Sequence, residues 1–289
     1  WDHTDPAIDA GEQDIMGEDL LVDCLPLGDV NIIYKERSMW AMSYIGAPYI
    51  FRFQKLPGEY GMLARGCAEN TPLGHVVMTS GDIIIHSGQG CTSIANAVIR
   101  NYIFSNISQT YYQRSFVTSN PGKNEVWICF PFGSEASTCN RAAVWNWVDK
   151  TWAIRTLTNV TYGTTGKVNY SASGIAWSDA STTWETQPGN WNDYDYSPAE
   201  SRLMLCHTNP YISLADVGPT DFGSVITSTL ERTGMHIDNP QNVKVCKAVY
   251  PRIDGTTGQT VQIEIGGSMT ANVAPTWSAP VTFTIGTDQ

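Results

Sequence analysis

Short runs in which apolar and polar residues alternate, separated by turn residues, recur through most of this 289-residue chain. The segment AAVWNWVDKTWAIRTL, residues 142–157, is the clearest example. Trp145 and Trp147 are two positions apart, and the alternation resumes at Trp152 after the polar stretch VDK. A period of two is that of a β-strand, in which successive side chains point to opposite faces. The segment therefore predicts a β-hairpin whose tryptophans fill a core or its lip.

The same alternation predicts a series of antiparallel meanders over residues 29–157. The runs are DVNIIYKE (29–36), SMWAMSYI (38–45), PYIFRFQKL (48–56), HVVMTS (75–80), DIIIHSG (82–88), YYQRSFVTS (111–119) and EVWICFPF (125–132), with RLMLCHT (202–208) and YISLADVG (211–218) beyond the hairpin. One segment differs, because CTSIANAVIRNYIFSNIS (91–108) spaces its apolar residues by three and four. That spacing predicts a short helix.

Composition also favours an all-β fold. Charged residues make up 16% of the chain, against roughly 25% in typical soluble domains. Short antiparallel strands rich in aromatics fit a propeller, a sandwich or a barrel, and no strict repeat of about 40 to 50 residues identifies a propeller. The expected organisation is a leading segment (1–28), a propeller-like β domain (29–228) and a small C-terminal β module (229–289), in which the runs VKVCKAVYPRID, GQTVQIEIGGS and APVTFTIG alternate around Asp254-Gly255. The chain has no initiator Met, so we expect a fragment of a longer protein with this module truncated.

The charge balance limits the partners. The formal net charge is −11, from 28 acidic and 17 basic side chains, and no basic run is present. This argues against a tight grip on nucleic acid, which needs phosphate-neutralising surfaces. No apolar run approaches the roughly 20 residues of a membrane-spanning helix, so no membrane partner is expected. The seven cysteines are odd in number and contain no C-x-x-C, which indicates reduced thiols and no essential disulfide.

Two clusters of residue types that bind metals lack the spacing of a known metal site. The first consists of Cys67, His75, His86 and Cys91. The second consists of Asn192, Asp193 and Asp195. The first matches no zinc finger, and the second lacks the acidic ladder and the glycine of an EF-hand. Because nucleophile-elbow, zinc-protease and phosphate-loop motifs are also missing, we expect no catalytic, cofactor or metal site and no enzyme activity.

One short segment points to another class of protein. SDASTTW, residues 178–184, resembles part of the Asp-box of sialidase-like propellers, with Ser181 where that motif has glycine. A sialidase also needs an arginine triad and a Tyr/Glu pair, which no motif in this chain provides. Exposed tryptophans could nevertheless stack on sugar rings. The alternative hypothesis is therefore a carbohydrate-acting or glycan-binding sialidase-like β-propeller.

Longer segments carry a resemblance to a viral family. KERSMW (35–40), GDIIIHSGQG (81–90), IANAVIRNYIF (94–104) and NPGKNEVWICFP (120–131) follow one another in this order, and residues 230–268 add a C-terminal segment. This succession resembles the tail hub or nozzle proteins of short-tailed bacteriophages (podoviruses), the phage stabilisation proteins among them. In that family the next pattern is W-N-x-x-D-x-x-W-x-x-R. It is matched by the structural hairpin, whose residues are Trp145, Asn146, Trp147, Asp149, Trp152 and Arg155.

The resemblance implies a structural virion protein with a β-propeller-like fold. Its copies would form a ring, usually a hexamer, around the channel through which DNA is ejected. It further implies the portal or adaptor and other tail proteins as partners, a location in the virion tail, and assembly in the host cytoplasm. Genomic DNA would pass through the channel without specific binding.

Charge gives an expectation for the wall of such a channel. A Lys or Arg facing the duplex would bind phosphate and slow its passage, whereas acidic side chains would keep DNA off the wall. We therefore expect a lumen that is net acidic or neutral. The acidic loop residues available for it are Asp14, Glu18, Asp19, Asp193, Asp195 and Asp221.

Overall fold

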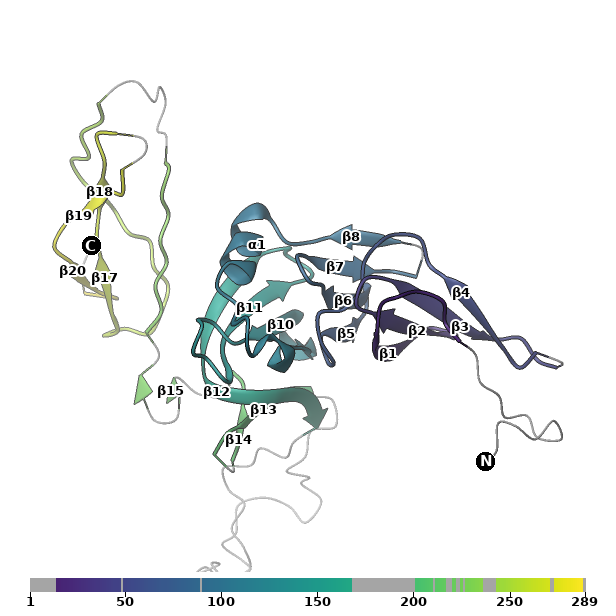
Figure 1. The fold of residues 1–289 in the computed structure, drawn as a ribbon. Coiled ribbons are helices and arrows are strands. Elements are labelled where there is room, and N and C mark those ends of the chain that lie inside the picture. The colour runs from purple at the N-terminus through teal and green to yellow at the C-terminus, as the bar shows by residue number, and fades with distance from the viewer. Residues whose placement is uncertain are drawn as a thin grey trace, which may run out of the picture. The chain divides into compact units, whose positions relative to one another are not determined.

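The computed structural model (Figure 1) describes residues 14–47, 49–88, 90–167, 201–209, 211–216, 220–221, 224–225, 227–235, 243–270 and 273–287. The chain divides into two compact units, Trp1–Pro219 and Thr220–Gln289.

The described residues of the N-terminal unit form three antiparallel sheets (Figure 1). The first contains β1 (Leu21–Leu27), β2 (Val30–Lys35), β3 (Met39–Tyr44) and β4 (Phe51–Lys55). The second contains β5 (Ala68–Thr71), β6 (Gly74–Met78), β7 (Ile83–His86) and β8 (Cys91–Ser93). The third contains β9 (Phe116–Asn120), β10 (Glu125–Phe130), β11 (Cys139–Asn146), β12 (Trp152–Lys167), β13 (Ser201–His207) and β14 (Ile212–Leu214). Helix α1 (Ala97–Phe104) follows the second sheet, and the 3-10 turns η1 (Tyr112–Arg114) and η2 (Pro121–Lys123) flank β9.

Each of these sheets is a meander in which every strand pairs with its neighbour in the chain. The prediction of an all-β fold built from antiparallel meanders is therefore confirmed for the described residues. The predicted helix is also present as α1, with Ile99 and Ile103 buried and Val98 exposed. All three sheets have open edges, so the propeller remains a proposal, taken up below.

Two apolar clusters lie on opposite faces of the third sheet. Alternation along β10 separates them, since Ile128 and Phe130 belong to the larger cluster whereas Trp127 and Cys129 belong to the smaller. The larger cluster also includes residues of the first two sheets and of α1, among them Ile32, Tyr34, Met39, Val76, Val77, Ile84, Ile99 and Ile103. β10 is buried on both faces, and its sequence EVWICF is accordingly apolar from Val126 to Phe130.

Strand β12 bends the third sheet back over itself (Figure 1). Its first part pairs with β11 and its second part with β13. The register shifts ahead of Val160, where Asn159 has φ +50°, and such bulges increase local bending. Beyond the bend, a Cβ added to Gly163 would lie 3.1 Å from the Phe116 ring of β9. The curled strand therefore covers the smaller apolar cluster.

The leading segment 1–28 needs a correction, because residues 21–27 form β1 and pair with β2. Two features hide this strand in the sequence. A register shift between Leu21 and Asp23 interrupts the period of two, and Pro26 is unfavourable in a strand except at an edge. β1 is such an edge, so the first sheet begins earlier than the alternation predicts.

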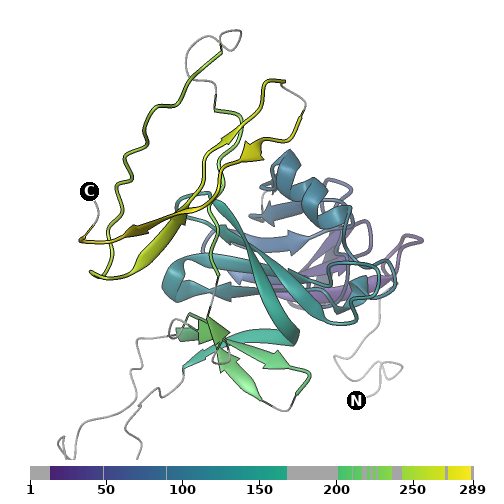
Figure 2. The same ribbon diagram turned by 90° about the vertical axis from the view of Figure 1, so that its left-hand side faces the viewer.

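The described residues of the C-terminal unit form three two-stranded sheets (Figure 2). They pair β15 (Thr220–Asp221) with β16 (Ser224–Val225), β17 (Thr260–Ile263) with β20 (Val281–Thr284), and β18 (Gly266–Gly267) with β19 (Thr276–Trp277). Of the three alternating runs, GQTVQIEIGGS and APVTFTIG contain the paired strands β17 and β20, whereas VKVCKAVYPRID forms no strand. Alternation reveals an amphipathic segment, but it carries no information about the partner.

Candidate functional site

The β11–β12 hairpin is held by a cross-strand tryptophan pair and by one asparagine. Trp145 and Trp152 are directly opposite each other, with ring centroids 6.3 Å apart and ring planes inclined by 36°. Asn146 Oδ1 accepts hydrogen bonds from the backbone N–H groups of Val148 and Asp149, both at 2.9 Å. An asparagine side chain that closes a turn on its own backbone explains why this position takes Asn. Asp149 therefore contributes through its backbone.

The tip of this hairpin is fixed to the turn between β9 and β10. The backbone N–H of Trp147 donates to the Asn124 carbonyl at 3.0 Å, and Asn146 Nδ2 donates to the Lys123 carbonyl at 3.3 Å. Asn124 has φ +57°, a conformation that asparagine tolerates better than most residues. Trp145 is buried, and Trp147 and Trp152 are half-buried against the same larger cluster. The three indoles thus cover one end of the main core.

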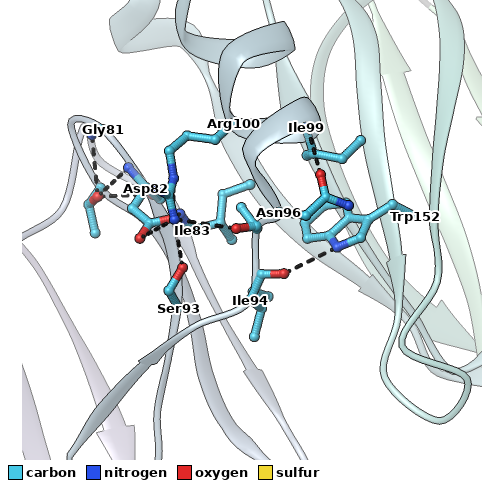
Figure 3. A network of polar contacts seen from close by, with 11 residues as sticks. Gly81, Asp82, Ile83, Ser93, Ile94, Asn96, Ile99, Arg100 and Trp152 are labelled. Carbon is cyan, nitrogen blue, oxygen red and sulfur yellow. Dashed lines mark hydrogen bonds and ion pairs between the residues drawn. The ribbon is translucent and has the colours of Figure 1, made fainter.

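Trp152 connects the hairpin to the segment that precedes α1 (Figure 3). Its indole Nε1 donates to the Ile94 carbonyl at 3.3 Å. Two residues later, Asn96 caps the helix, because its Oδ1 accepts from the Ile99 N–H at 2.9 Å. Asn is among the preferred N-cap residues, since its side chain satisfies an N–H of the first turn. The start of α1 is therefore held beside the hairpin.

Arg100 of α1 reaches back to the β6–β7 turn (Figure 3). Its Nε and Nη2 each donate to one oxygen of Asp82, both at 3.1 Å. Nη2 also donates to Ser93 Oγ at 3.0 Å and to the Ala95 carbonyl at 3.3 Å. A two-point contact of this kind fixes the guanidinium plane as well as its charge. The helix is thereby oriented on the second sheet.

We call the set Asp82, Ser93, Ile94, Asn96, Arg100 and Trp152 the polar junction. It joins three stretches far apart in the sequence, the β6–β7 turn, the start of α1 and the β11–β12 hairpin. Its two charges, Arg100 and Asp82, are paired, and the Trp152 indole N–H has the Ile94 carbonyl as its acceptor. Groups engaged in this way are suited to holding elements in place rather than to proton transfer or nucleophilic attack.

Arg155 lies on the face of the third sheet opposite to the three tryptophans. Its Nη1 is 2.7 Å from Asp216 Oδ1, and its guanidinium stacks 4.8 Å from the centre of the Trp127 ring. Asp216 also accepts from Asn120 Nδ2 at 2.9 Å. The six hairpin residues singled out from the sequence therefore support two different faces and do not converge on one site.

No family model and no curated protein matches this chain. The site is consequently interpreted from its own contacts. Within the described ranges, no helix has the length and apolarity that crossing a membrane requires.

The two histidines of the first metal-type cluster meet at Tyr34, between the first and second sheets. All three side chains are buried. His75 Nε2 is 2.9 Å from the Pro26 carbonyl, which can only accept, so this nitrogen carries the proton. The Tyr34 hydroxyl then donates to His75 Nδ1 at 2.8 Å, and His86 Nδ1 lies 3.5 Å from the same hydroxyl. Burial lowers the pKa of both histidines, and the proximity of His75 lowers that of His86 further.

The two cysteines of that cluster lie in different surroundings. Cys67 is buried and its thiol donates to the Ser115 carbonyl at 3.2 Å, while burial raises its pKa to about 12. Cys91 is opposite His86 in the β7–β8 pair, and burial raises its pKa to about 11. Metal binding requires thiolates, which these pKa values disfavour. Among the described residues, no group of three or more His, Cys, Asp or Glu side chains is placed to hold an ion.

Asp19, assigned above to the acidic loops, forms a structural ion pair. Its carboxylate is 2.9 Å from Nζ of the buried Lys35 and accepts from Ser38 Oγ at 2.8 Å. Burial alone would raise the pKa of Asp19, but these hydrogen bonds and one from the Arg37 N–H bring it down to about 2. Its charge therefore compensates a buried lysine. Asp14 and Glu18 are exposed.

Some sequence-derived candidates lie outside the described residues. They are the SDASTTW segment and the residues Asn192, Asp193 and Asp195. The sequence did not single out Asp82, Ser93 or Tyr34, and it grouped His75 and His86 only as residue types that bind metals. The available signal for the Tyr34–His75–His86 cluster was a pair of histidines within strands that are otherwise apolar, HVVM and IIIH.

Proposed function

We propose that this chain is a structural subunit of a ring that forms the tail hub or nozzle of a short-tailed bacteriophage. The observation that carries the proposal is the polar junction. The GDIIIH, IANAVIR and WNxxDxxW segments, which carry the resemblance, contact one another through Asp82–Arg100 and Trp152–Ile94. Contacts of this kind are what a structural role of the three segments requires. No catalytic step is assigned to the chain.

The exposed tip of the β3–β4 hairpin supports assembly of copies. Four large apolar side chains are exposed there, Tyr44 (70%), Ile45 (51%), Tyr49 (75%) and Phe51 (47%). Tyr44 and Phe51 pair edge to face, with ring centroids 6.1 Å apart. A contiguous exposed group of aromatics marks an interaction surface, and Tyr is enriched at such surfaces. We assign this tip to the contact between copies.

The propeller belongs to the same proposal. Two four-stranded meanders and the β9–β12 part of the third sheet have the strand order of propeller blades. In the proposed assembly, identical subunits contact each other head to tail, since such contacts close into a ring around an axis. Portal or adaptor proteins would bind one end of the ring and other tail proteins its other end, and genomic DNA would pass along the axis.

Measuring the mass of the assembly tests this function. The purified chain should form closed oligomers of one size, with Tyr49→Asp shifting the population to monomers because a charge at the tip opposes burial. Lys123→Asp, which places a charge on an exposed turn away from the tip, is the matched control and should assemble normally. Monomers at all concentrations would count against the ring.

The second candidate is a glycan-binding protein, and one pocket favours it. The pocket, of about 280 Å³, is lined by Arg65, Arg114, Tyr162 and Ser115, whose buried Oγ has no hydrogen-bond partner among the described residues. Two guanidinium groups and an aromatic ring suit an acidic sugar. Titration with a sialic-acid-containing trisaccharide discriminates the two functions, since saturable binding lost in Arg114→Ala would favour this candidate.

A further inference from the structure

We propose that residues 243–253 add as a β-strand to the N-terminal unit of a second copy of this chain. This inference rests on the proposed function, because it describes a contact between copies. It starts from the sequence VKVCKAVYPRI, which has the alternation of a strand although no strand is formed there. In Figure 2 this stretch belongs to the long limb in yellow-green that has no arrow.

The side chains of this segment have the two-faced pattern of a strand. Val243, Val245, Val249 and Ile253 share one parity. Val243 and Val245 are 72% and 78% exposed, and Tyr250 of the other parity is 86% exposed. Side chains of one parity lie on one face of a strand. The segment therefore presents exposed valines on one face, with Lys247 among them, whereas Pro251 and Ile253 at its end are partly buried.

Its backbone is not paired with another strand. In the described part of the chain, residues 243–253 make no backbone–backbone hydrogen bond, and the Ala248 carbonyl accepts a bond from the Cys246 thiol at 3.7 Å, whereas β17 and β20 of the same unit are paired. Unpaired N–H and C=O groups along an extended segment are a template for another strand. Strand addition of this type supplies affinity through the main chain and specificity through alternate side chains.

The unit that contains this segment has little core of its own. Of its described apolar residues, Ile285 alone is buried. Its sheets are two-stranded, and such ribbons are marginally stable without further strands or a packed face. Because the segment stays unpaired inside its own unit, we infer that its pairing strand belongs to another part of the assembly.

Charge points to the N-terminal unit of another copy as that partner. Residues 243–253 carry Lys244, Lys247 and Arg252 and no acidic side chain. Residues 220–289 contain four basic and six acidic side chains, so residues 1–219 hold the remaining 13 basic and 22 acidic, a net charge of −9. Opposite charges steer two surfaces together and fix their register. A basic strand on an acidic unit also forms the head-to-tail contact from which a ring closes.

Amide hydrogen exchange on the full chain, measured below and above the concentration at which it assembles, tests the proposal. We expect the amide exchange rates of residues 243–250 to be lower in the assembly than in the monomer by about tenfold or more. The double variant Val245→Asp/Val249→Asp should weaken assembly by about tenfold or more, since it charges the apolar face. The control Ala248→Thr/Tyr250→Thr alters the other face without removing a charge and should stay within about threefold of wild type.

The outcomes separate this inference from the proposed function. If the wild type assembles but residues 243–250 exchange equally fast in both states, strand addition is overturned and the ring remains. If these amides are already protected in the monomer, the segment pairs within its own chain and the inference fails. If no assembly forms at any concentration, both fail. Near-ultraviolet circular dichroism of the variants verifies that the tryptophan-rich N-terminal unit is folded.

Discussion

Among single side chains, Arg100 tests the polar junction most directly. Its guanidinium bonds both oxygens of Asp82 and also Ser93 and Ala95. Lysine keeps the charge but lacks the planar fork. Arg100→Lys should therefore lower the free energy of unfolding by about 1 kcal/mol, which is the upper end of the contributions measured for exposed ion pairs. Chemical denaturation measures this, with Arg52→Lys on the exposed edge strand β4 as the control expected to change it by less than about 0.5 kcal/mol.

The buried Tyr34–His75–His86 cluster predicts a loss of stability in acid. The pKa of both histidines is lowered from 6.5 by burial, so below pH 6.5 the unfolded chain binds protons that the folded chain does not. Stability is thus fully present above pH 6.5 and declines as the pH falls toward the folded pKa values, by at most about 1.4 kcal/mol per pH unit for each histidine.

Denaturation curves at about pH 7.5 and about pH 5.5 measure this dependence. The double variant His75→Gln/His86→Gln should show a flatter dependence on pH, whatever its absolute stability. An unchanged slope would mean that other groups cause the acid sensitivity. Cys91, opposite His86, remains protonated over this range because burial raises its pKa.

Among the elements, the β11–β12 hairpin depends on Trp152. The indole packs on the main core, pairs with Trp145 and donates to Ile94. Trp152→Ala should reduce the free energy of unfolding by about 2 to 3 kcal/mol, below the value for a fully buried ring because the side chain is half-buried. Trp152→Phe keeps the ring and loses only the N–H, so it should cost about 1 kcal/mol. Val148→Ala at the exposed turn is the control and should leave the free energy of unfolding nearly unchanged. Thermal unfolding of Trp152→Ala identical to that of the wild type would contradict a stabilising role of this indole.

The β6–β7 pair depends on a glycine that no alternation identifies. Gly74 has φ +115°, and a Cβ there would lie 2.4 Å from the His86 carbonyl oxygen. Because the colliding atom is backbone, the strands would have to separate. Gly74→Ala should lower stability by about 2 to 4 kcal/mol, whereas Gly90→Ala, with open space around its Cβ position, should have little effect. Equal melting temperatures for the two variants would show that β6 and β7 can move apart without a loss of stability.

Elements of this chain differed in how well the sequence predicted them. The hairpin at 142–157, the meanders and α1 follow from local periodicity, because each buries one face or one stripe. β1 was missed because a register shift and Pro26 break its period. The polar junction was not predicted as a unit, since pairs such as Asp82–Arg100 and Ile94–Trp152 arise only when separate elements pack. Residues 243–253 carry the period of a strand, but a period specifies no partner.

For the whole molecule, the charge predicts weak interaction with duplex DNA. The net charge of −11 includes no basic run, and the basic side chains of the polar junction and of the Arg155–Asp216 pair are already engaged. Affinity measured by electrophoretic mobility at low salt should be weaker than about 10 µM, with a shallow salt dependence. Tight binding with a steep dependence, or a continuous band of Lys and Arg facing the axis of the assembly, would contradict a net acidic or neutral lumen.

Low-resolution imaging of the purified particles tests the proposed assembly. We expect a closed ring of identical subunits around an axial channel, six-fold as the resemblance implies, because head-to-tail contacts close by rotation. Particles that are monomers, or dimers with a two-fold axis and no channel, would contradict it.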